Sequence, residues 1–545
     1  PVLSSTLTPA AICSGSTFGY TATSGTGGAT FAWSRAAIGG ILEAANAGSG
    51  NVSETLTNVT TAPINVTYVY TVTANGCAGP SQNVVVTVNP NPVLSSTLTP
   101  ASICSGTSFS YAPTSATTGA TFSWSRATVA GITPVGPTSG TNNPNETLTN
   151  TTTAPVTVTY QYTVSANGCS TVQNVVVTVN PTPVLTSTLS PAAICSGSTF
   201  GYTATSSTAG ATFSWTRAAV VGIAEVAGSG TGNVSEVLTN TTTGPLNVTY
   251  AYTVSANGCT NGSVFNVVVA VNPRPVLSST LTPAAICSGS TFGYTATSGT
   301  GGATFAWSRA AIGGILEAAN AGSGNVSETL TNVTTAPINV TYVYTVTANG
   351  CAGPSQNVVV TVNPNPVLSS TLTPASICSG TSFSYAPTSA TTGATFSWSR
   401  ATVAGITPVG PTSGTNNPNE TLTNTTTAPV TVTYQYTVSA NGCSTVQNVV
   451  VTVNPTPVLT STLSPAAICS GSTFGYTATS STAGATFSWT RAAVVGIAEV
   501  AGSGTGNVSE VLTNTTTGPL NVTYAYTVSA NGCTNGSVFN VVVTV

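Results

Sequence analysis

The chain has 545 residues, but its only charged side chains are 7 Arg and 10 Glu; Lys, Asp, His and Met are absent. Charged residues make up 3% of the sequence, against about 25% in ordinary globular proteins. This composition excludes His-based catalytic triads, Lys-dependent phosphate loops and Schiff bases, His-containing zinc sites and Asp-rich calcium loops. We therefore expect no cofactor and no metal. A formal net charge of -3 also argues against a nucleic-acid partner, because phosphate binding needs clustered basic side chains.

The low charge does not indicate disorder, because 41% of the residues are hydrophobic and Val, Thr, Tyr and Phe recur in alternating runs. The apolar stretches, such as residues 36–47, are short and interrupted by Gly, well below the roughly 20 residues that span a bilayer. We expect a folded protein that does not span a membrane. The pattern starts and stops at unit boundaries, so we expect it to be a section of a longer array.

The sequence is built from six tandem units that open with close variants of PVLSSTLTPAAICSGSTFGY. The predicted domains are 1–91, 92–182, 183–274, 275–365, 366–456 and 457–545, of types A, B, C, A, B and C. Residues 1–274 recur from Pro275 onward, and the only difference is Ala270 in place of Thr544.

Within the first unit, residues 18–20 and 31–35 give the first alternating segments, which predict β-strands. Residues 36–47 predict an irregular connection, because the second unit carries Pro134 and Pro137 in the equivalent stretch and a helix interior would not accept them. Residues 54–57 predict another strand.

The second half of the unit has the clearest alternation. Residues 65–72 place Val66, Tyr68, Tyr70 and Val72 on one face, and Asn75-Gly76 is a strong hairpin signal before a last strand at residues 83–88. Roughly seven short strands per unit predict an all-β, immunoglobulin-like sandwich. Pro-x-Pro links between the units restrict the backbone, so we expect the six sandwiches to form an extended rod.

Cysteine occurs twice per unit with a spacing of about 64 residues, and no CxxC motif is present. We predict a structural disulfide inside each unit and therefore an oxidising, extracellular location; the alternative is buried free thiols. The predicted pairs are Cys13 with Cys77, Cys104 with Cys169, Cys195 with Cys259, Cys287 with Cys351, Cys378 with Cys443, and Cys469 with Cys533.

Each unit also has an Arg two residues after its single Trp, and a Glu about 19 residues later. The spacing of two puts Trp and Arg on the same strand face. We predict a structural ion pair beside the indole ring, with a ligand site as the alternative reading. The pairs are Arg35 with Glu54, Arg126 with Glu146, Arg217 with Glu236, Arg309 with Glu328, Arg400 with Glu420, and Arg491 with Glu510.

Two Glu in one unit, Glu43 and Glu54, are the residue types that a glycosidase uses as acid and nucleophile. The second unit has only Glu146, so the pattern does not recur. We therefore predict that the chain has no catalytic residues and is not an enzyme.

The segments ICSGSTFGYTATS, ATFAWSRA, GNVSETLTNVTTAPINVTYVYTVTANGC and NVVVTVNP resemble the PKD-like repeats of giant secreted proteins in gliding Bacteroidota, and most closely the SprB-type gliding-motility adhesins. The resemblance extends over every unit. It implies a PKD-like or immunoglobulin-like sandwich and secretion to the cell surface, as part of a filament that attaches to a substrate while a motor moves it.

The resemblance also implies partners. These are external surfaces or polysaccharide, with cell-envelope anchoring or motility machinery contacted through regions outside these residues. We therefore expect the stalk of a cell-surface adhesin filament. The alternatives are a purely structural extracellular fibre or sheath, and a spacer array within a polysaccharide-degrading enzyme.

Overall fold

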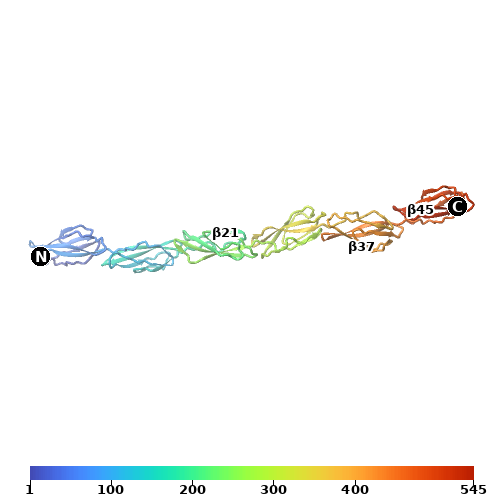
Figure 1. Cartoon of the computed structure of the whole chain (residues 1–545). Coiled ribbons are helices and arrows are strands. Elements are labelled where there is room, and N and C mark those ends of the chain that lie inside the picture. Colours follow the sequence, from blue (N-terminus) through green and yellow to red (C-terminus); the bar gives the residue numbers. More distant parts are fainter. The chain divides into compact units, whose positions relative to one another are not determined.

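The computed structural model describes all 545 residues and contains strands, turns and connecting segments but no helix (Figure 1). The chain divides into two compact units, Pro1–Pro273 and Arg274–Val545. Each contains three repeats, and each of the six repeats has its own hydrophobic cluster. The predicted all-β fold of six tandem sandwiches is confirmed.

The strands of the unit Pro1–Pro273 follow the repeats. The first repeat has β1 (Ile12–Cys13), β2 (Ser16–Tyr20), β3 (Thr30–Arg35), β4 (Asn46–Ser49), β5 (Val52–Leu56), β6 (Ile64–Ala74), β7 (Cys77–Ala78) and β8 (Gln82–Asn89). The second has β9 (Ile103–Cys104), β10 (Thr107–Phe109), β11 (Thr121–Arg126), β12 (Ile132–Thr133), β13 (Thr138–Thr141), β14 (Glu146–Asn150), β15 (Val156–Ala166) and β16 (Cys169–Asn180). The third has β17 (Ile194–Cys195), β18 (Ser198–Tyr202), β19 (Thr212–Arg217), β20 (Gly228–Thr231), β21 (Val234–Leu238), β22 (Leu246–Ala256), β23 (Cys259–Thr260) and β24 (Phe265–Asn272).

The unit Arg274–Val545 repeats this order. Its first repeat has β25 (Ile286–Cys287), β26 (Ser290–Tyr294), β27 (Thr304–Arg309), β28 (Asn320–Ser323), β29 (Val326–Leu330), β30 (Ile338–Ala348), β31 (Cys351–Ala352) and β32 (Gln356–Asn363). The next has β33 (Ile377–Cys378), β34 (Thr381–Phe383), β35 (Thr395–Arg400), β36 (Ile406–Thr407), β37 (Thr412–Thr415), β38 (Glu420–Asn424), β39 (Val430–Ala440) and β40 (Cys443–Asn454). The last has β41 (Ser472–Tyr476), β42 (Thr486–Arg491), β43 (Gly502–Thr505), β44 (Val508–Leu512), β45 (Asn521–Ala530), β46 (Cys533–Thr534) and β47 (Phe539–Thr544).

Each repeat is a sandwich of one large and one small sheet. In the first repeat the large sheet has the order β1-β8-β6-β3-β4, with β7 paired to β6, and the small sheet is the pair β2-β5. All pairs are antiparallel except β1 with β8. The short strand β1 was not predicted, because two residues are too few to show an alternation.

The core lies between the two sheets and follows the predicted alternation. Val66, Tyr68, Tyr70 and Val72 of β6 are all fully buried, whereas Val69 is exposed. The rings of β2 pack against these tyrosines at a tilt, and the centroids of Phe18 and Tyr68 are 5.2 Å apart. Because aromatic pairs at this separation bury large areas, they hold the small sheet against the large one.

The Asn75-Gly76 turn adopts the positive φ angles of a tight hairpin, 48° and 79°. It closes β6 onto β7, with Ala74 opposite Cys77. The stretch after β3 is irregular as predicted, except that its last residues begin β4.

The strand directions give each repeat two distinct ends. β1 runs parallel to β8 and places Cys13 opposite Asn89, so both lie where the chain leaves the repeat; we call this the exit end. The Asn75-Gly76 turn and Cys77 lie at the other end of β6, next to Pro1; we call this the entry end. Corresponding residues occupy the same ends in the other repeats.

Candidate functional site

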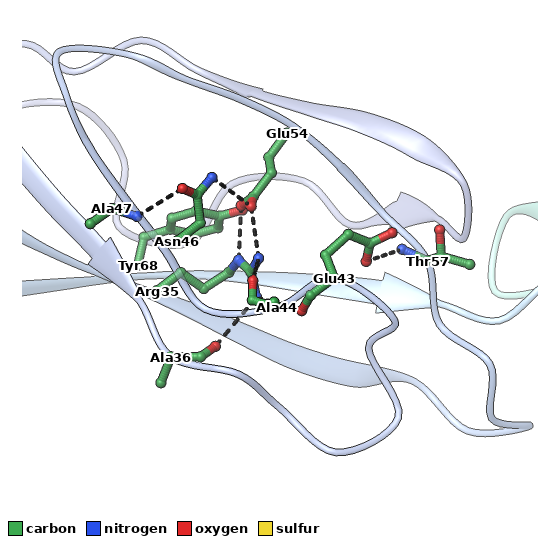
Figure 2. A network of polar contacts seen from close by, with 9 residues as sticks. All are labelled: Arg35, Ala36, Glu43, Ala44, Asn46, Ala47, Glu54, Thr57 and Tyr68. Atoms are coloured by element: carbon green, nitrogen blue, oxygen red, sulfur yellow. Dashed lines mark hydrogen bonds and ion pairs between the residues drawn. The ribbon is translucent and has the colours of Figure 1, made fainter.

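A buried ion pair joins the two sheets of each sandwich. Arg35 on β3 points into the core with a fully buried side chain, and Glu54 reaches it from β5 of the small sheet (Figure 2). Arg35 Nε donates to Glu54 Oε2 at 2.8 Å, and an Nη donates to Oε1 at 2.7 Å. This two-pronged geometry is the strong form of an Arg–carboxylate contact.

Neighbouring side chains complete the hydrogen bonding of the carboxylate. The Tyr68 hydroxyl donates to Glu54 Oε2 at 2.5 Å, and Asn46 Nδ2 donates to Oε1 at 3.0 Å. Tyr68 was not predicted as part of the site. Its place on the buried face of β6 identified it only as a core residue.

The guanidinium also holds the loop between β3 and β4, residues 36–45. Arg35 donates to the carbonyl oxygens of Ala44 at 2.6 Å, Ala36 at 3.3 Å and Glu43 at 3.4 Å. The carboxylate of Glu43 does not join Glu54; it accepts a hydrogen bond from the Thr57 backbone N–H at 2.8 Å (Figure 2). The two carboxylates therefore have separate structural roles.

The pKa values of the network reflect these contacts. Burial alone would raise the pKa of Glu54, but hydrogen bonds from Arg35, Tyr68 and Asn46 outweigh it and lower that pKa to about 2. Burial and the adjacent carboxylate raise the pKa of Tyr68. The hydrogen bond to Glu54 is the main cause that raises the pKa of Arg35. Arg35 and Glu54 are thus charged and Tyr68 is neutral across the physiological range.

The structure brings together every predicted Arg–Glu pair. The shortest N–O distances are 2.9 Å for Arg126 with Glu146, 2.9 Å for Arg217 with Glu236, 3.0 Å for Arg309 with Glu328, 2.9 Å for Arg400 with Glu420, and 2.9 Å for Arg491 with Glu510. In each case a tyrosine donates to the same carboxylate: Tyr160, Tyr250, Tyr342, Tyr434 and Tyr524.

The contacts of this network all lie within one repeat. The hydrogen-bonding groups of Arg35 and Glu54 are used by side chains and carbonyls of their own repeat, so the geometry favours the structural reading over a ligand site. No group of three or more His, Cys, Asp or Glu gathers anywhere in the chain to hold a metal.

The loop held by the arginine carries exposed apolar side chains in every repeat. Leu42 is 70% exposed in the first repeat, Val135 is 70% exposed in the second, and Val221 is 97% exposed in the third. Six of the seven arginines are buried in the sandwiches, so the exposed Arg274 is the only surface arginine. The surface is therefore nearly free of positive charge. The exposed loops on it are residues 36–45, 127–137 and 218–227 and their counterparts in the second unit.

The disulfides differ from the prediction, because they join consecutive repeats. Cys13 pairs with Cys169, Cys104 with Cys259, Cys287 with Cys443, and Cys378 with Cys533. Cys195 and Cys351 are also disulfide-bonded. Cys77 and Cys469 are free and exposed. The predicted pairing within each repeat is therefore wrong.

Strand direction explains the error. Cys13 lies at the exit end and Cys77 at the entry end, separated by the 11 residues of β6, which span about 33 Å. A disulfide requires Cα atoms within about 7 Å, so the two thiols of one repeat cannot meet. In a tandem array the spacing within a unit and the spacing between units are both constant. The periodicity therefore could not distinguish the two pairings.

A hydrogen bond accompanies each of these disulfides. Asn89 Nδ2, beside Cys13, donates to the carbonyl oxygen of Asn167 in the next repeat at 2.8 Å. Asn167 belongs to the hairpin turn that precedes Cys169. The exit end of one repeat thus receives the entry-end turn of the next. The same bond occurs from Asn180 to Asn257, from Asn363 to Asn441 and from Asn454 to Asn531.

A family model described as a PKD-like domain matches the chain six times, at residues 10–92, 101–183, 192–275, 284–366, 375–457 and 466–545. No curated protein sequence matches. No helix of the structure is long and apolar enough to cross a membrane.

Solved structures that match the chain include several multidomain arrays. They include the N-terminal eight Ig domains of Down Syndrome Cell Adhesion Molecule, at 12% identity over 98% of this chain and 71% of that chain, with a TM-score of 0.26. The protocadherin GammaB4 extracellular domain matches at 11% identity over 98% and 99%, with a TM-score of 0.23. Immunoglobulin domains 1-5 of Sidekick-1 match at 11% identity over 83% and 98%, with a TM-score of 0.21.

Proposed function

Because this chain belongs to the PKD-like domain family along all six of its repeats, we propose that it is the repetitive stalk of an extracellular adhesin filament. The observation that carries the proposal is the covalent linkage of consecutive repeats by disulfides. Such bonds persist in an oxidising compartment and are rare in the cytosol, which supports a location outside the cell. The resemblance to gliding-motility adhesins supports the further role in attachment during surface movement.

The exposed loops are the proposed contact surface for external surfaces or polysaccharide. Leu42, Val135 and Val221 project from a nearly uncharged exterior, and their counterparts recur in the second unit. Each contact is weak, but many weak contacts on one chain raise the overall affinity, because the first contact raises the effective concentration of the others. Burying the arginines inside the sandwiches removes the charge repulsion that would otherwise oppose such contacts.

The first experiment is genetic. The six repeats are deleted in frame in the organism that encodes them, and attachment to glass and to polysaccharide is scored together with surface movement. We expect both to be lost. Normal attachment combined with a missing sheath would instead support a structural fibre, and lost polysaccharide breakdown would support a spacer in an enzyme. Antibody labelling of intact, unpermeabilised cells tests the surface location.

The second experiment tests the loops. Leu42, Val135 and Val221 and their counterparts Leu316, Val409 and Val495 are replaced by Ser, and binding of beads coated with the purified chain is measured. We expect reduced binding to apolar and polysaccharide surfaces. The matched control replaces Val59, Val172, Val333 and Val446, which are 56–64% exposed but lie outside the loops, by Ser. Equal losses in both sets would contradict the proposed contact surface.

A further inference from the structure

The disulfides connect the repeats in a pattern that bears on how the chain carries tension. The second repeat, residues 92–182, has two covalent links to the first, the peptide chain at Pro92 and the disulfide at Cys169. It also has two links to the third, the peptide chain after Asn180 and the disulfide at Cys104.

Two short segments join these links across the second repeat. One is β16, the continuous strand from Cys169 to Asn180. The other is the segment 92–104, which runs beside β16 in the same direction. The Thr171 hydroxyl donates to the Pro92 carbonyl, Leu94 N–H donates to Gln173 Oε1, Val176 N–H donates to the Leu98 carbonyl, and Ile103 and Cys104 pair with Val179 and Asn180.

These segments continue through the neighbouring repeats as two straps. The first strap runs through residues 1–13, crosses the Cys13–Cys169 disulfide, and continues along β16 to Thr182. The second strap runs along β8, through the linker and residues 92–104, crosses the Cys104–Cys259 disulfide and continues through residues 259–272. The unit Arg274–Val545 has the same two straps. Its first strap crosses the Cys287–Cys443 disulfide into β40, and its second strap crosses the Cys378–Cys533 disulfide.

We propose that these straps carry tension along each unit: in Pro1–Pro273 the first strap bypasses residues 14–168 and the second bypasses residues 105–258. Residues 105–168 of the second repeat, which include its ion pair and core strands β11 and β15, form a loop between Cys104 and Cys169 that lies outside both straps. A strand already rises about 3.3 Å per residue, close to the limit of an extended chain, so β16 cannot lengthen under load. A sandwich that a strap bypasses therefore stays folded under tension as long as the disulfide of that strap is intact.

The test is force spectroscopy on the full chain, with handles attached through non-cysteine chemistry at the N-terminus and at the exposed Thr182. Between these points the first strap is the short covalent path. We expect the oxidised chain to show no unfolding step. The Cys13→Ser, Cys169→Ser variant breaks this strap, so tension must cross both repeats, and we expect two steps of about 280 Å, the extended length of roughly 90 residues less the folded span.

Two controls make the result specific to the path. The Cys104→Ser, Cys259→Ser variant loses a disulfide of the same kind that the first strap does not use, so it should show no step. Cys77→Ser removes a free thiol and should also show none. Circular dichroism establishes that each variant retains its β-structure before pulling.

Three results would overturn the inference: steps in the oxidised wild type at forces that unfold the Cys13→Ser, Cys169→Ser variant, no steps in that variant, or steps in the Cys104→Ser, Cys259→Ser control. The readout is a length, so it is independent of the proposed adhesive function. A chain that fails to adhere can still pass this test, and an adhesive chain can fail it.

Discussion

A buried guanidinium is costly to desolvate, and Arg35 offsets this cost with a paired carboxylate and three backbone carbonyls. The arrangement makes one side chain responsible for both the contact between the sheets and the shape of the exposed loop. The Trp–x–Arg spacing predicted the inward direction of Arg35. The carbonyl contacts could not be predicted, because they depend on the path of an irregular loop.

Removing one partner of this buried pair should lower the stability of the repeat much more than removing a partly exposed carboxylate does. Glu54→Gln leaves the charge of Arg35 buried without a counterion, and we expect the first repeat to lose about 3 kcal/mol of stability. Hydrogen exchange followed by mass spectrometry checks this, since the substituted peptide has its own mass. The fourth repeat, identical in sequence to the first, is the internal control.

Glu43→Gln provides a matched variant for this experiment. Glu43 is partly exposed, and an amide oxygen can still accept the hydrogen bond from Thr57, so we expect a change below about 1 kcal/mol. Equal loss of protection in the two variants would show that the Arg35–Glu54 pair has no special weight.

The same pair predicts acid sensitivity. The pKa of Glu54 is about 2 in the folded chain and about 4.3 when unfolded, so the folded state favours the ionised form. Its contribution to stability is complete above pH ~4.3 and is lost as the pH falls from there toward ~2. The melting temperature, followed by circular dichroism, should therefore drop across this window. The Glu54→Gln variant should show a smaller drop, and an equal drop would exclude Glu54 as a contributor.

At the level of strands, the alternating pattern was sufficient wherever a strand is long and one of its faces is buried. It predicted the inward face of β6 and the Asn75-Gly76 turn, because a period of two and a turn that needs positive φ both leave local signals. It did not predict β1 or β4. These short strands depend on pairing with distant partners, β8 and β3.

One buried side chain connects such distant elements. Asn58 Nδ2 donates to the carbonyls of Ala62 and Val88, both at 2.8 Å, while its Oδ1 accepts from the Thr60 N–H at 2.9 Å. It therefore ties the loop before β6 to the end of β8.

Asn58→Ala should remove the amide donor from the Val88 carbonyl and from the Ala62 carbonyl, which still accepts from the Thr60 hydroxyl, at a cost of about 1 to 3 kcal/mol. We expect faster hydrogen exchange in the loop that carries the substitution and at the end of β8. The same regions around Asn332 in the fourth repeat provide the comparison. Unchanged exchange would mean that water replaces the amide at no cost.

At the level of the whole molecule, the regular cysteine spacing was compatible with pairing inside a repeat, about 64 residues apart, and with pairing between consecutive repeats, 155 or 156 residues apart. The missing information was the polarity of the sheet, which places the two thiols of one repeat at opposite ends. The sequence therefore identified the cysteines as structural but did not identify their partners. That connectivity distinguishes a series of separately closed domains from a chain whose repeats are covalently interlocked.

Proteolysis can separate these two connectivities. The six buried arginines fall once in each repeat, so trypsin acting on the denatured, unreduced chain cuts between the two cysteines of every repeat. With disulfides between repeats, fragment 1–35 stays attached to fragment 127–217 through Cys13 and Cys169. Fragment 36–126 stays attached to fragment 218–309 through Cys104 and Cys259, since the Arg274-Pro275 bond resists cleavage. Pairing within repeats would instead join 1–35 to 36–126.

Mass spectrometry of the unreduced digest distinguishes the two pairings, and a thiol reagent applied before digestion should label Cys77 and Cys469 alone. Recovery of the linked 1–35 and 36–126 fragments would refute the interlocked arrangement and, with it, the straps that depend on it.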